Sequence, residues 1–127
     1  IGSDTMVTID GLPLGKPKDE KQAADMLRRL RGRTHEVLTG LAVLPPGGKV
    51  RTLCTRTRVT FRDFAEDELA AYLATGEPLD KAGAYGIQGH GALLIRGIEG
   101  DYYSVMGLPV APLYETLRGL HALAGTA

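Results

Sequence analysis

The 127-residue sequence predicts a mixed α/β fold: an elongated, twisted mixed sheet with helices packed on it. Two long segments, 34–44 and 49–61, alternate in the manner of strands, and three others carry apolar residues at helical spacing. The predicted strands come in pairs between helices, which disfavours a purely parallel, doubly wound sheet. This length suits one domain, which we take as residues 1–127.

The first half of the chain begins with a short strand and a helix. The strand, residues 6–9, is β-branched and ends at the turn signal Asp10-Gly11. Two prolines make residues 12–17 a loop or an edge strand. The helix begins near residue 18 or 19 and stops at Gly32. Its predicted buried face consists of Ala23, Leu27 and Leu30.

The two long strands are joined by a loop at residues 45–48, which read Pro-Pro-Gly-Gly. Side chains of a strand alternate between its faces. One face of the second strand is therefore Leu53, Thr55, Thr57, Val59 and Phe61. Cys54 belongs to the other set. We interpret it as a small core residue, since no activating base accompanies it.

The second half predicts a helix from about Glu66 to Gly76 that buries Leu69, Tyr72 and Leu73. Residues 77–91 are rich in glycine and too irregular for either period. Strands are expected at 92–98 and 102–105. The last helix starts near Pro109, and its apolar face is Leu113, Leu117 and Leu120.

Composition argues against several functions. Fifteen basic and fifteen acidic residues give a formal net charge of zero, and aromatic residues make up 6% of the chain. A nucleic-acid partner is therefore not expected. No apolar run approaches a membrane span, so no membrane partner is expected either. The single cysteine excludes an intramolecular disulfide and favours the reducing cytoplasm.

Asp4 stands in the segment Gly2-Ser3-Asp4-Thr5, at the edge of a predicted strand. A carboxylate at this place can act as a general base on water or hold a divalent cation. The alternative is a turn aspartate that hydrogen-bonds to nearby backbone, and spacing alone favours that interpretation.

Lys16 lies between a glycine and a proline, just before a predicted helix. A lysine there can meet a phosphate as a point charge, close to helix amides that favour anions. The P-loop spacing is absent. A solvated lysine is the alternative, and for Lys16 alone it is the favoured one.

The segment 75–89 is a long loop punctuated by glycines, which allow the backbone to approach a ligand closely. Gln88 offers both a donor and an acceptor to the edge of a base. Because long structured loops are more often functional than not, we interpret this one as part of a binding site.

Taken together, these segments resemble the Maf family, nearly along the whole chain and in the same order. The matching segments are Gly2-Ser3-Asp4-Thr5, Asp10-Gly11, Leu14-Gly15-Lys16-Pro17, residues 31–37, Thr39-Gly40, residues 59–62, 75–78, 80–89 and 105–109. The block from Asp80 to Gly89 is the most specific of them.

The resemblance implies a Maf/ITPase-like fold and a nucleoside triphosphate pyrophosphatase, which releases a nucleoside monophosphate and diphosphate with magnesium or manganese. By resemblance, Asp4 matches the catalytic general base and Lys16 a phosphate-contacting lysine. Thr5 and Gln88 match positions linked to base selection. Thr5 and the Ile-Gln-Gly sequence around Gln88 are similar to the branch that acts on dTTP and UTP. Members of the family form dimers, so a homodimer is among the implied partners.

The sequence departs from the family pattern at its N-terminus, where a basic triphosphate-binding segment is not found before Ile1. We therefore expect an N-terminally truncated form of the fold, with low or no activity by itself. The alternative is a non-catalytic remnant that binds nucleotides or regulates division through protein contacts.

Overall fold

The computed structural model describes residues 1–120 and contains one five-stranded sheet. The strand order is β2-β1-β3-β4-β5, and each neighbouring pair is antiparallel. The strands are β1 (Gly2–Ile9), β2 (Leu12–Leu14), β3 (Thr34–Val43), β4 (Arg51–Phe61) and β5 (Ile95–Glu99). Helices flank this sheet, so the predicted α/β class is confirmed.

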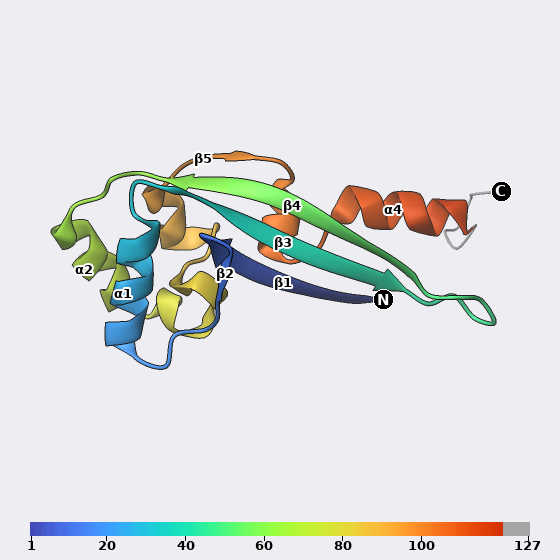
Figure 1. Cartoon of the computed structure of the whole chain (residues 1–127), viewed down its shortest axis with the longest axis horizontal. Coiled ribbons are helices and arrows are strands. Elements are labelled where there is room, and N and C mark those ends of the chain that lie inside the picture. The colour runs from blue at the N-terminus through green and yellow to red at the C-terminus, as the bar shows by residue number, and fades with distance from the viewer. Residues whose placement is uncertain (121–127) are drawn as a thin grey trace.

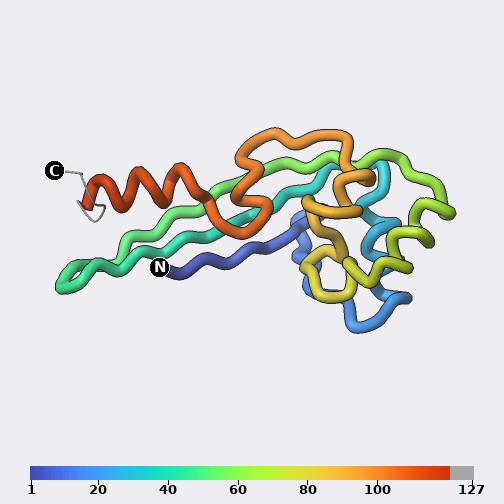
Figure 2. Tube along the Cα trace, turned by 180° about the vertical axis from the view of Figure 1, so that it is seen from behind, coloured from blue at the N-terminus to red at the C-terminus, as the bar shows by residue number. Residues whose placement is uncertain are grey.

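The helices gather mainly at one end of the sheet. They are α1 (Glu20–Leu30), α2 (Glu66–Ala74), α3 (Tyr102–Met106) and α4 (Val110–Gly119), with three short 3₁₀ helices η1 (Glu77–Asp80), η2 (Ala82–Ala84) and η3 (Gly89–Leu94). Figure 1 shows α1, α2 and the 3₁₀ segment at one end, while the β3–β4 hairpin runs out to the other. Seen from behind in Figure 2, α4 lies at the same end of the molecule as the tip of that hairpin. The molecule is elongated because β3 and β4 stay paired from Thr34–Thr60 to Val43–Arg51.

Helix α1 has the start and the buried face that its sequence predicts. The Asp19 carboxylate caps it by accepting the Gln22 backbone N–H at 2.8 Å. Ala23, Leu27 and Leu30 are fully buried. They face a core built on Phe61, Phe64 and Leu69, to which β1 and β3 contribute Val7, Ile9 and Val37.

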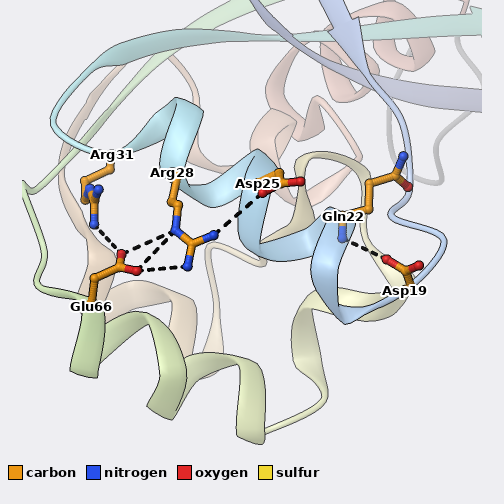
Figure 3. A network of polar contacts seen from close by, with 6 residues as sticks. All are labelled: Asp19, Gln22, Asp25, Arg28, Arg31 and Glu66. Carbon is orange, nitrogen blue, oxygen red and sulfur yellow. Dashed lines mark hydrogen bonds and ion pairs between the residues drawn. The ribbon is translucent and has the colours of Figure 1, made fainter.

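An exposed ion cluster joins α1 to α2. Glu66, at the start of α2, accepts from Arg28 Nη2 at 2.8 Å and from Arg31 Nη1 at 2.7 Å. Figure 3 shows both guanidinium groups reaching toward Glu66, and Arg28 also approaching Asp25. The hydrogen bond from Arg28 is the main reason why the pKa of Glu66 is lowered. The cluster links two helices whose apolar faces share one core.

The predicted strand at 102–105 is wrong, because these residues form helix α3. Its tyrosines favour a strand by propensity, but Asp101 provides a helix cap. The Asp101 carboxylate accepts the Tyr103 N–H at 3.2 Å and the Ser104 hydroxyl at 2.6 Å. Gly107, with φ of 123°, ends the helix. Only the second half of the strand expected at 92–98 forms, since η3 runs to Leu94.

The interpretation of Cys54 as a core residue is also wrong, since its side chain is exposed. The predicted alternation of β4 holds: Thr57, Val59 and Phe61 are buried. Cys54 lies on the opposite face, which the helices do not cover. Within residues 1–120, no helix is both long and apolar enough to cross a membrane.

Candidate functional site

A cavity of about 480 Å³ lies between the sheet and the glycine-rich segment. Its volume is in the range of small-molecule sites. Strands β1 and β3 form one wall, the segment after α2 forms another, and α3 closes a side. The lining residues are Thr5, Val7, Val37, Glu77, Lys81, Ala82, Tyr85, Gly86, Ile87, Gln88, Gly89, Val105 and Met106.

Thr5 and Gln88, the two residues expected to select the base, line this same cavity. Thr5 sits on a fixed floor, because its Oγ1 lies 3.2 Å from Thr39 Oγ1. Thr39 is fully buried and donates to the Ser104 carbonyl at 2.6 Å. Gln88 stands on the exposed rim, where an amide can meet a polar ligand edge. Their roles toward a ligand remain predictions.

The wall opposite the sheet is tied down by close backbone approach. Gly83 has φ of +74°, and a Cβ there would lie 2.9 Å from Val7 Cγ1. Its N–H donates to the Gly15 carbonyl at 3.1 Å. A side chain at position 83 would push the wall away from β1, so glycine is required at this point.

Lys16 does not line the cavity. It is exposed, in the segment that Gly15 ties to Gly83. Two amides near the start of α1 are engaged: the Lys18 N–H donates to the Gln22 side chain at 2.6 Å, and the Gln22 N–H donates to Asp19. The phosphate contact stays a prediction.

Asp4 is also outside the cavity. Neighbouring strand residues point to opposite faces, so Asp4 is on the other side of β1 from Thr5. Its carboxylate is exposed and accepts the Thr5 backbone N–H at 2.9 Å, the local bond that the alternative interpretation describes. It borders a shallow hollow with Gly40 and Thr52. The structure thus unites two of the four predicted residues and separates the other two from them.

Two charged residues of the cavity were not assigned a role from the sequence: Glu77 and Lys81. Lys81 is the only cation among the described lining residues, and its stem lies along Gly86, where a Cβ would be 2.9 Å from Lys81 Cε. Both residues belong to the glycine-punctuated segment. The spacing of its glycines indicated a ligand loop, but not which charged side chains turn inward.

No three His, Cys, Asp or Glu side chains of residues 1–120 gather where they could hold a metal ion. Glu77 is the only carboxylate that lines the cavity in the described part of the chain, and it already accepts the Gly91 N–H at 3.0 Å. These residues alone therefore do not fit a protein-held metal centre.

Below the cavity floor, Tyr85 joins the wall to β3. Its hydroxyl lies 2.6 Å from His35 Nε2, and Phe61 packs edge-on against both rings. Burial lowers the pKa of His35 to about 4 and raises the pKa of Tyr85. Both side chains are therefore neutral at pH 7, as the interior of a core requires.

Comparison with known proteins adds a family and close relatives. A family model described as Maf-like protein matches residues 1–120. The chain is 54% identical over 121 residues to a protein of Dictyoglomus thermophilum and 56% identical over 120 residues to one of Bacillus velezensis. A third, from Aquifex aeolicus, is 48% identical over 126 residues. Each of these three relatives is named dTTP/UTP pyrophosphatase.

The alignments cover 94%, 94% and 99% of this chain, in the same order. They cover 63%, 61% and 66% of the relatives. The chain therefore spans about three fifths of the length of the curated relatives that it matches.

Proposed function

The chain belongs to the family of Maf-like proteins, and on that premise we propose that the whole protein is a pyrophosphatase acting on dTTP and UTP. The reaction would break the bond between the α- and β-phosphates. Its products would be a nucleoside monophosphate and diphosphate. The names of the relatives at 54% and 56% identity support this proposal.

One observation of the structure carries the proposal: Thr5 and Gln88, far apart in the sequence, meet at one cavity of about 480 Å³. We propose that the Gln88 amide pairs with the donor and acceptor edge of a thymine or uracil. Bases that leave such hydrogen bonds unmade would be rejected. Thr5 would fix the same edge from the sheet side. Lys81 also lines the cavity, together with the oppositely charged Glu77, and its ammonium group lies 3.7 Å from Asp80 Oδ1.

Asp4 and Lys16 are the residues proposed to act on the triphosphate of the substrate. Asp4 would take a proton from water as the water oxygen attacks the α-phosphorus and the bond to the β-phosphate oxygen breaks. Lys16 would stabilise the negative charge of the departing diphosphate. Both side chains are exposed, and neither lines the cavity that holds Thr5 and Gln88.

A divalent cation, magnesium or manganese, is proposed to arrive with the phosphates of the substrate. The described residues do not gather a three-ligand site for it, so no step here is derived through it. A homodimer and a cytoplasmic location are proposed from the family resemblance and from the single cysteine.

A second candidate is nucleotide binding without hydrolysis. It is favoured by one observation, the position of Asp4 on the other face of β1 from the cavity. The two candidates differ in the effect of replacing Asp4. An enzyme that uses Asp4 as its base loses turnover, whereas a binding protein has no turnover to lose.

The test replaces Asp4 with Asn in the whole protein, with Asp67→Asn as the matched control, since Asp67 is an exposed carboxylate of α2. Under the enzyme proposal, Asp4→Asn lowers kcat for UTP by at least about a hundredfold. Binding of a non-hydrolysable UTP analogue stays within about threefold. Turnover by Asp4→Asn equal to that of Asp67→Asn would rule out Asp4 as the base.

A further inference from the structure

The loop that carries Gln88 is held at both ends by side chains from outside it. At one end, the Gly86 N–H donates to Tyr72 Oη at 3.1 Å. At the other, the Gly91 N–H donates to Glu77 Oε2 at 3.0 Å. Gln88, which lines the cavity, therefore lies at the tip of a loop whose two ends are fixed.

The loop also closes on itself without spare room. A Cβ at Gly91 would lie 1.9 Å from the Gly86 carbonyl oxygen, so the two ends of the loop touch through backbone. Gly89 has φ of +67°, and a Cβ there would lie 2.5 Å from Glu77 Oε1. The Glu77 carboxylate thus binds one amide and packs against the next turn of the same loop. A change in the shape of this loop would have to break the hydrogen bonds of Gly86 and Gly91 to its anchors.

The two anchors are themselves fixed. Tyr72 is buried on α2, with 4% of its surface exposed. Glu77 begins η1, and its own N–H donates to Thr75 Oγ1 at 3.1 Å. The Thr75 hydroxyl donates in turn to the Tyr72 carbonyl at 2.6 Å. The end of α2 and the start of η1 therefore form one rigid support for the loop.

We propose that Glu77, together with Tyr72, is a positioning residue that sets the base selectivity of the cavity. This inference rests on the proposed function. The Glu77 carboxylate acts as an acceptor for the Gly91 amide, and through the closed loop it fixes where the Gln88 amide stands. A hydrogen-bonding site discriminates between bases only when its donors and acceptors are held in place. With the anchor removed, Gln88 adapts to the wrong base and selectivity falls.

Glu77 also borders the cavity, so a direct contact with ligand through its charge is the competing role. Glu77→Gln separates the two, because the amide oxygen can still accept the Gly91 N–H while the charge is gone. Glu77→Ala removes both. A positioning role predicts that Gln rescues the function, and a charge role predicts that it does not.

The experiment measures kcat/KM of the whole protein for UTP and CTP in Glu77→Ala, Glu77→Gln and Tyr72→Phe. Asp67→Ala serves as the control, an exposed carboxylate on α2. Glu77→Ala lowers the UTP-to-CTP ratio by at least about tenfold. Tyr72→Phe lowers it less, because the Gly91 anchor remains. The UTP-to-CTP ratio of Glu77→Gln stays within about threefold of the wild-type ratio. The ratio of Asp67→Ala equals that of the wild type.

A readout that needs no turnover is the hydrogen exchange of the Gly86 and Gly91 amides. Glu77→Ala speeds exchange at Gly91, and Glu77→Gln keeps it slow. A UTP-to-CTP ratio that is unchanged in Glu77→Ala, or Glu77→Gln as unselective as Glu77→Ala, would overturn the positioning role. If the wild type hydrolyses neither nucleotide, the proposed function fails. In that case the positioning role of Glu77 is tested in the same variants by the ratio of their affinities for non-hydrolysable UTP and CTP analogues. A ratio that is unchanged in Glu77→Ala overturns it.

Discussion

His35 Nε2 lies 2.6 Å from Tyr85 Oη in the buried core, and this contact joins β3 to the wall of the cavity. The His35 side chain is 2% exposed. Its second ring nitrogen, Nδ1, is buried and has no hydrogen-bond partner in the described structure. A protonated imidazole would therefore carry a charge that the core does not compensate.

We predict that His35 makes stability depend on pH. Its pKa is about 4 in the fold and near 6.5 when unfolded, so between these values the unfolded chain binds more protons. The contribution of neutral His35 to the free energy of unfolding is fully present above about pH 6.5. It is lost as the pH falls toward 4, which lowers the free energy of unfolding by about 3 kcal/mol in all. Urea unfolding of the wild type and His35→Gln at pH 4.5 and 7.5 checks this. The variant should lose less stability on acidification; equal losses would contradict the account.

Gly83→Ala should destabilise the fold by about 1–3 kcal/mol. The residue has positive φ, and the new methyl group would meet the Val7 side chain at 2.9 Å. Gly97→Ala is the matched control, since a Cβ at Gly97 meets nothing within 4 Å. The measurement is the midpoint of thermal unfolding. A midpoint of Gly83→Ala as high as that of Gly97→Ala would show that the wall is not tied to β1 in this way.

Glu66→Gln should have a small effect that added salt removes. The group is exposed, and its ion pairs with Arg28 and Arg31 face solvent. Because its pKa is lowered in the fold, its contribution is present above the pKa of the unfolded chain and is lost at lower pH. Thermal unfolding at low and at about 1 M salt tests this. A large loss that persists in salt would mean that the cluster is more than a solvated pair.

Thr5→Val should weaken selection between pyrimidine and purine nucleotides more than it weakens stability. The substitution keeps the branched shape against Thr39 and removes the hydroxyl of a residue that lines the cavity. We expect kcat/KM for UTP to fall at least about tenfold, with the ratio to GTP falling as well. Thr55→Val, at a half-buried hydroxyl outside the cavity lining, serves as the control. An equal loss of UTP turnover in both variants would mean that the loss comes from a disturbed sheet and not from the missing Thr5 hydroxyl.

Strands β3 and β4 and helices α1 and α2 could be predicted because their side chains follow a period that burial enforces. Ala23, Leu27 and Leu30 repeat on one face and are buried. The helix at residues 102–106 could not be predicted from period, since it is five residues long and depends on the Asp101 cap. Propensity alone favours a strand for its two tyrosines.

The candidate site was predictable only in part. Thr5 and Gln88 were identified by their motifs, and the fold brings them to one cavity. The separation of Asp4 from that cavity follows from the alternation of β1, which the motif did not reveal. The anchoring role proposed for Glu77 depends on a backbone amide 14 positions away. No spacing rule for side chains contains that information, because the partner is a glycine N–H.

The most direct test of the central claim is the product analysis of a nucleotide panel with the whole protein. The panel is dTTP, UTP, CTP, GTP and ATP, each with magnesium or manganese. The account predicts that dTTP and UTP are cleaved fastest, and that each yields a monophosphate and diphosphate in equal amounts. Release of single phosphate with a nucleoside diphosphate, or equal rates for all five nucleotides, would contradict it.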